Sequence, residues 1–165
     1  MKYRGMLAAL LLCLPLASCA RNVRFDYSEL NIRLREADDA FCFRETELLY
    51  ADSTYYAFYA VNGEDGMLLT MRGDETGLLD RVTLTLDADA KSAAPTFVSF
   101  AEALATVFIP GVDMDALREK TGLPDAASGA FDGLFRGIPG RYETGFYRAE
   151  LIPGNEGCVF AVEYV

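Results

Sequence analysis

The spacing of hydrophobic residues predicts that the folded part of the chain begins with a helix. Over residues 25–37 apolar side chains recur at helical intervals. Asp26 or Ser28 would cap the start of this helix, because a short polar side chain there can accept a hydrogen bond from a backbone N–H that the helix leaves unpaired. Residues 30–34 also alternate between apolar and polar, so a strand remains the alternative for this segment.

Residues 40–87 have the pattern of strands. Short runs rich in aromatic and β-branched residues are separated by glycine-containing turns at 62–66 and 73–77. The run 79–87 alternates between valine or leucine and threonine, which is typical of an antiparallel strand with one face in water. The predicted strands are 40–50, 54–61, 67–72 and 79–87.

Helical spacing returns after residue 95. From Phe97 onward apolar residues recur at i, i+3, i+4, i+7 and i+11, which predicts a helix over 97–108 with one buried face. Its start would be capped by Thr96 or by Ser99, which has capping-box spacing from Glu102.

A second, short helix and two strands complete the chain. Asp113 or Asp115 would cap this helix, which would run through Lys120 and stop at Gly122. Residues 125–140 are rich in Ala, Gly and Ser and predict a loop or an irregular turn. The last two predicted strands are 142–152 and 157–165.

This order of elements, α-β-β-β-β-α-α-β-β, predicts an α+β fold. We expect an antiparallel sheet of about five to six strands with helices packed on one face. No repeat or linker divides residues 25–165, so they should form a single domain. The order loosely resembles that of type III secretion chaperones and other small helix-on-sheet folds, and this resemblance is one of architecture alone.

The first residues have the pattern of an export signal. Two basic residues precede residues 6–16, an uncharged apolar stretch that is too short to span a bilayer as a permanent helix. The stretch is followed by small residues and a cysteine, and the end of the segment resembles the lipobox of bacterial lipoproteins. The motif reads Leu16-Ala17-Ser18-Cys19.

The resemblance to lipoproteins implies acylation of the cysteine and cleavage just before it. It therefore implies a signal peptide at 1–18, a lipidated Cys19 that begins a tether at 19–24, and the domain behind them. Two or three acyl chains would hold the protein firmly on the cell membrane or outer membrane, facing away from the cytoplasm. An ordinary secretory peptide cut near Ala20 is the alternative.

Composition narrows the chemistry. The chain has 165 residues, 15 Lys+Arg against 25 Asp+Glu, a net charge of -10 and no histidine. Without histidine there is no Ser-His-Asp or Cys-His nucleophile, and so acidic a chain is not expected to bind nucleic acid. The acid pairs Asp87/Asp89 and Asp113/Asp115 lack the remainder of a calcium loop, so no metal site is predicted.

Two pairs of residues in the predicted strands are candidate sites. Cys42 and Cys158 form a candidate disulfide, since adjacent strands can bring two cysteines within bonding range; two buried free thiols are the alternative. Tyr55 and Tyr59 share one face of a predicted strand and would form a platform that stacks on sugars or peptides. Ordinary sheet packing is the alternative for the tyrosines.

These features together predict a non-enzymatic, membrane-anchored lipoprotein. Its partners would be the lipid bilayer, through acylated Cys19, and an unidentified protein or small molecule. No cofactor and no catalytic residue is assigned. Two alternatives stay open: an envelope enzyme that acts on glycan with carboxylates, and a structural or assembly component of the cell envelope.

Overall fold

The computed structural model describes residues 24–37, 41, 47–51, 54–60 and 66–165, with the backbone alone for 47–51 and 54–60. The described helices are α1 (Tyr27–Ala37), α2 (Ala94–Phe108), α3 (Met114–Thr121) and α4 (Gly133–Arg136), with a 3-10 helix, η1 (Ala88–Ala93). The strands are β1 (Glu47–Ala51), β2 (Thr54–Ala60), β3 (Met67–Gly73), β4 (Leu79–Asp87), β5 (Gly140–Thr144), β6 (Tyr147–Gly154) and β7 (Gly157–Tyr164).

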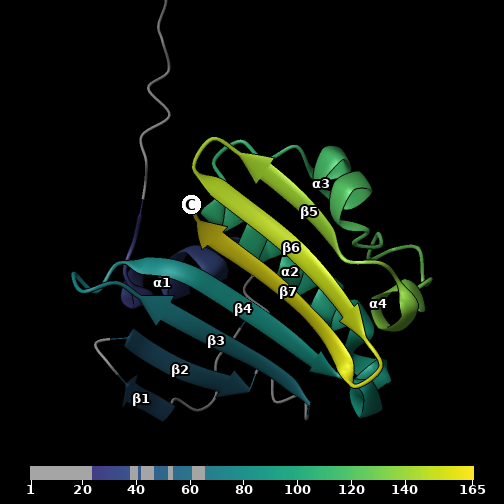
Figure 1. Ribbon diagram of the computed structural model, residues 1–165, viewed down its shortest axis with the longest axis horizontal. Helices are drawn as coiled ribbons and strands as arrows, with labels where there is room; N and C mark the ends of the chain where they lie inside the picture. The colour runs from purple at the N-terminus through teal and green to yellow at the C-terminus, as the bar shows by residue number, and fades with distance from the viewer. Residues whose placement is uncertain (1–23, 38–40, 42–46, 52–53, 61–65) are drawn as a thin grey trace, which may run out of the picture.

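The described strands form one antiparallel sheet in the order β1-β2-β3-β4-β7-β6-β5 (Figure 1). Strands β1 to β4 are one meander and β5 to β7 are another. The two meanders meet where β4 pairs with β7, from the pair Arg81 and Glu163 to the pair Asp87 and Gly157. The connection between the meanders runs through the helices α2, α3 and α4.

The helices cover one face of this sheet, the far side in Figure 1. Helix α2 lies at the centre of the helical layer, and its Phe97, Phe100 and Leu104 are completely buried. Leu84 of β4 and Phe160 of β7 are also completely buried. None of the described helices crosses the near side of the sheet. The predicted α+β fold, with helices on one face of an antiparallel sheet, is confirmed.

Helix α1 forms where its spacing predicts it. The Asp26 side chain accepts a hydrogen bond from the Glu29 backbone N–H at 2.9 Å, which satisfies one of the unpaired donors at the helix start. Leu30 and Leu34 are buried, whereas Ile32 between them is exposed. The strand alternative for this segment is therefore wrong.

Helix α3 also follows its sequence signals. The Asp113 side chain accepts a hydrogen bond from the Ala116 backbone N–H at 3.1 Å, so Asp113 is the cap and Asp115 is not. Gly122 ends the helix with a φ of 76°, a left-handed conformation that glycine adopts without steric cost.

Helix α2 begins earlier than predicted. It starts at Ala94, directly after η1, and no side chain caps it. The predicted caps Thr96 and Ser99 are wrong, because both lie inside the helix. Glu102, the expected partner of Ser99, instead contacts Arg118 of α3 at 2.8 Å.

The segment predicted as one strand at 142–152 is two strands, which gives the sheet seven described strands. The chain reverses at Gly145 and Phe146, so that Thr144 of β5 pairs with Tyr147 of β6. Residues 125–140, predicted as a loop, contain the one-turn helix α4.

Candidate functional site

The candidate site is the side of the sheet that the described helices leave uncovered. We define the open face as the residues of β3 to β7 that alternate with the core residues and point away from the helices. They are Leu68, Thr70, Arg72, Arg81, Thr83, Thr85, Arg141, Glu143, Arg148, Glu150, Ile152, Val159, Ala161 and Glu163. Because arginines are prominent among them, the acidic excess of the chain does not lie on this face.

One row of the open face is charged across five strands. Its members stand directly opposite one another in the strand register and therefore share a face. In the order of the strands β3, β4, β7, β6 and β5, the charged row is Arg72, Arg81, Glu163, Arg148 and Glu143. This row lies at the end of the sheet that carries the β3–β4 and β5–β6 turns.

Glu163 holds the centre of the charged row. Its carboxylate lies 3.1 Å from Arg81 on one side and 2.7 Å from Arg148 on the other. Arg148 also donates to Glu143 at 2.8 Å. The hydrogen bonds from Arg148 to Glu143 and to Glu163 raise the pKa of its guanidinium above the ordinary value, so Arg148 stays charged.

Arg72 and Arg81 are like charges that face each other. A register shift at Arg72 and Gly73 makes Asp80 an extra residue beside Arg81. The Asp80 carboxylate lies 2.9 Å from Arg72, while Arg81 binds Glu163. Each arginine therefore has its own carboxylate, which offsets their mutual repulsion.

The face loses charge toward the other end of the strands. The middle row is Thr70, Thr83, Ala161, Glu150 and Arg141, the last two in contact at 2.6 Å. The apolar row is Leu68, Thr85, Val159 and Ile152, of which Leu68 and Ile152 are exposed. The open face thus combines small and apolar residues with a border of ion pairs, a composition found in protein–protein interfaces.

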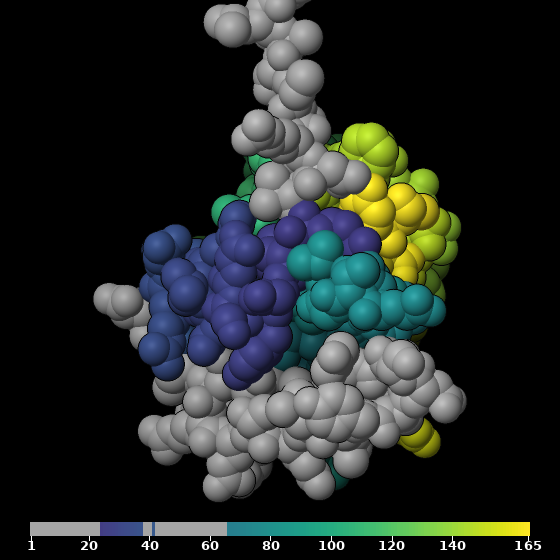
Figure 2. Space-filling model, turned by 90° about the vertical axis from the view of Figure 1, so that its left-hand side faces the viewer, coloured from purple at the N-terminus to yellow at the C-terminus, as the bar shows by residue number. Residues whose placement is uncertain are grey.

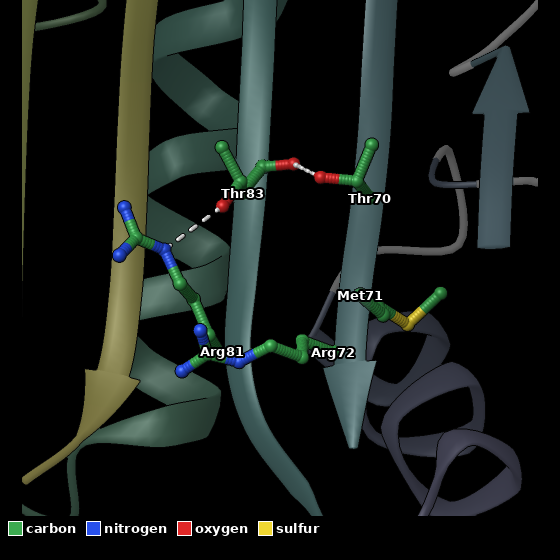
Figure 3. Close-up of a pocket in the computed structure, with 5 residues that line it drawn as sticks. All are labelled: Thr70, Met71, Arg72, Arg81 and Thr83. Atoms are coloured by element: carbon green, nitrogen blue, oxygen red, sulfur yellow. Dashed lines mark hydrogen bonds between the residues drawn. The ribbon is translucent and has the colours of Figure 1, made fainter. Parts of the chain in front are cut away.

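A hollow of about 220 Å³ lies on the open face between β3 and β4, lined by Thr70, Met71, Arg72, Arg81 and Thr83 (Figure 3). The Thr70 hydroxyl donates to the Thr83 carbonyl at 3.5 Å, and Arg81 Nε donates to the Thr83 hydroxyl at 3.4 Å. Figure 3 shows Arg81 extending toward β7 and Arg72 extending toward β4. The Arg81 guanidinium and the Thr83 hydroxyl can donate here to a carboxylate or a backbone carbonyl.

A second hollow, of about 440 Å³, lies on the helical side. Its lining comes from the end of α1, from Phe41 after that helix, and from α2 and α3. The lining residues are Ala37, Phe41, Ser99, Glu102, Ala103, Thr106, Met114 and Arg118. Arg118 donates to Glu102 at 2.9 Å, and this hydrogen bond raises the pKa of Arg118. Glu102, the carboxylate among the lining residues that the structure describes, is thus already paired.

Cys158, one of the predicted site residues, is completely buried on β7 and is not bonded to any of the described residues. Burial raises the pKa of its thiol form to about 12, so that thiol would be unreactive in the folded protein. Cys42 and Cys19 lie outside the described residues. The disulfide to Cys42 and the lipidation of Cys19 therefore stay predictions.

The other predicted site residues are placed less completely. Tyr55 and Tyr59 lie on β2, where the backbone register pairs them with Tyr50 and Leu69. Their side chains lie outside the described part of the chain, so the aromatic platform stays a prediction. Among the described residues, no group of three or more acids or cysteines is arranged to hold a metal ion.

The chain matches no protein-family model, no curated protein and no solved structure. Within the described ranges, none of the helices combines the length and the apolar character needed to cross a membrane.

The sequence indicated the open face in part only. The alternation over 79–87 predicted one wet face for β4. The charged row was not predicted, because it depends on which strands are neighbours and in what register.

Proposed function

We propose that the chain is an exported, non-enzymatic lipoprotein that is anchored through acylated Cys19 and binds a partner protein through its open face. It would reside on the cell membrane or outer membrane, facing away from the cytoplasm. The anchor is supported by the leader and by Leu16-Ala17-Ser18-Cys19, followed closely by a domain. The observation that carries the binding role is the uncovered face, where small and apolar residues are bordered by ion pairs.

The partner we propose is a protein with a flat surface of small and apolar residues. Such a surface would cover the apolar row and the centre of the middle row, where burial of apolar area gives binding energy. A carboxylate or backbone carbonyl of the partner would accept hydrogen bonds in the hollow from the Thr83 hydroxyl or from Arg81. The charged row contains both arginines and glutamates, so it would favour a partner whose own charges are arranged with the opposite signs.

A glycan-acting enzyme has less support. Glycoside hydrolysis uses two acids that flank the scissile bond. Among the described residues of the open face, the acids Glu143, Glu150 and Glu163 are each held by an arginine. These carboxylates, which such a reaction would need as its acid and base or nucleophile, are thus engaged in ion pairs with arginines.

The anchor is tested by metabolic labelling with a palmitate analogue in a host that lipidates proteins. We expect label on the wild-type protein and none on a Cys19→Ser variant. Absence of label on the wild type, or equal label on both proteins, would contradict the anchor.

The binding face is tested by photo-crosslinking in cells at two half-buried valines. A photoreactive amino acid at Val159, on the open face, should give a discrete protein adduct. The control places the same photoreactive amino acid at Val107, on α2. Thr85→Arg, which places a bulky charge beside Val159 in the apolar row, should remove the adduct. No adduct from Val159, or an equal adduct from Val107, would refute this surface.

A further inference from the structure

The end of the domain that carries Arg24, the described residue nearest to Cys19 in the sequence, has a distinct surface. We call it the anchor-proximal end and define it by Arg24, the turns 74–78 and 145–146, Tyr164 and Val165. Figure 2 views this side of the molecule, where α1, the β3–β4 turn and residues at the end of β7 lie close to one another.

Arg24 fixes the point of departure. Its guanidinium lies 2.7 Å from the Asp74 carboxylate, donates to the Leu78 carbonyl at 3.3 Å and lies over the Tyr164 ring at 5.1 Å from the ring centre. The next residue, Phe25, accepts a hydrogen bond from the Leu79 backbone N–H at 2.9 Å. Residues 24 and 25 are therefore tied to the ends of β4 and β7.

The short tether limits which part of the domain can reach the bilayer. Arg24 is the fifth residue after Cys19, and five residues span at most about 18 Å. Strand β4 runs away from this end for 9 residues, a length of about 27 Å at the usual rise per residue. With the acyl chains of Cys19 inserted, the opposite end of the sheet therefore cannot point at the membrane.

Apolar and aromatic groups are exposed at the anchor-proximal end. Phe146 is 48% exposed and Val165 is 59% exposed, and the Val165 backbone N–H donates to the Phe146 carbonyl at 2.9 Å. The Phe146 ring stacks on Tyr164, with ring centres 6.2 Å apart and an angle of 10° between the planes. Aromatic rings beside polar and basic groups are favoured at the level of the lipid headgroups.

We propose that the anchor-proximal end is a membrane-contact surface. Phe146 and Val165 would lie at the headgroup level of the bilayer that holds the acyl chains, with Arg24 directly above them. The strands would then run away from the bilayer, and the open face would be reached from the side. This inference rests on the proposed lipid anchor.

The absence of tryptophan from the chain makes a direct test available. F146W and I138W each introduce a single tryptophan. The first lies at the anchor-proximal end. The second replaces Ile138, which is 87% exposed and precedes the start of β5, at the opposite end of the sheet. Each full-length lipidated variant is bound to vesicles of phosphatidylethanolamine and phosphatidylglycerol that contain brominated lipid, and quenching of the tryptophan fluorescence is measured. Urea unfolding of both variants checks that they fold.

We expect at least about threefold stronger quenching for F146W than for I138W, since only the first places its fluorophore among the headgroups. Equal quenching, or stronger quenching of I138W, would overturn the membrane-contact surface. A flotation assay, which measures whether the protein stays bound to the vesicles, distinguishes failure of the contact surface from failure of the anchor. If the protein floats with the vesicles but the quenching does not differ, the contact surface fails alone; if the wild type does not float, the lipid anchor fails.

Discussion

Arg81 on β4 and Glu163 on β7 stand directly opposite each other, and their 3.1 Å contact crosses the junction of the two meanders. Glu163 extends this link to Arg148 on β6. The Glu163 carboxylate, 16% exposed, therefore connects three neighbouring strands, of which β4 is distant in the sequence from β6 and β7.

Glu163→Gln should destabilise the protein by about 1–2 kcal/mol, because it removes a charge that two arginines share in a partly buried position. Urea unfolding measures this change in free energy. Glu143→Gln is the matched control: Glu143 is 53% exposed at the end of the same row, and its replacement should cost no more than about 0.5 kcal/mol. Equal losses for the two variants would contradict the central role of Glu163.

Gly140→Ala should cost about 1–3 kcal/mol, because the added methyl group overpacks the contact between β5 and α3. A Cβ at Gly140 would lie 2.6 Å from the Lys120 carbonyl oxygen and would also collide with the Thr121 carbonyl. Gly145→Ala is the control, since nothing lies within 4 Å of a Cβ there. Thermal unfolding should show a lower Tm for the first variant only; an unchanged Tm would contradict this packing.

Asp74 should make stability depend on pH at the acid end. The hydrogen bond from the Thr76 hydroxyl, followed by that from the Thr76 backbone N–H and the contact with Arg24, lowers the Asp74 pKa from 3.8 to about 2. The charged carboxylate thus stabilises the fold above pH 3.8, and this contribution is lost as the pH falls through about 2.

The measurement is the free energy of unfolding over that range of pH. Asp74→Asn should lose stability less steeply on acidification than the wild type does. Thr76→Val, which removes the hydroxyl and keeps the carboxylate, should fall between the two. The same slope for all three proteins would exclude this origin of the pH dependence.

Cys158 should resist alkylation while the protein is folded. Its thiol is completely buried and its pKa is raised to about 12, so at about pH 8 the reactive thiolate is scarce and inaccessible. Iodoacetamide treatment with reductant present, followed by mass spectrometry, should modify Cys158 in urea and leave it unmodified without urea. Rapid modification of the folded protein would contradict its burial.

The same reagent tests the predicted disulfide. In urea without reductant, modification of both Cys42 and Cys158 would exclude the bond, whereas protection of both until reductant is added would establish it.

The helices with local signals were predictable from the sequence. Asp113 marks the start of α3 and Gly122 marks its end, because a cap and a left-handed glycine act within a single turn. The start of α2 was not predictable from Ser99 and Glu102, since their spacing also occurs inside a helix. Glu102 is held by Arg118, a contact between two helices that local spacing does not encode.

The candidate site was less predictable than the fold. The alternation in β4 indicates which residues face water, but the charged row requires the register between β4 and β7. The turn at Gly145 and Phe146 was missed because aromatic residues continue on both sides of it, so the pattern reads as one strand. Phe146 is therefore an exposed turn residue and not the strand residue that the sequence predicts.

Strand β7, the last described strand in chain order, lies inside the sheet between β4 and β6. A polypeptide that emerges N-terminus first must therefore wait for residues 157–164 before the sheet can close, and until then β4 keeps an unpaired edge. A premature stop or a proteolytic cut just before Gly157 would not trim the domain slightly. It would leave two partial sheets whose free edges invite pairing with other chains and aggregation.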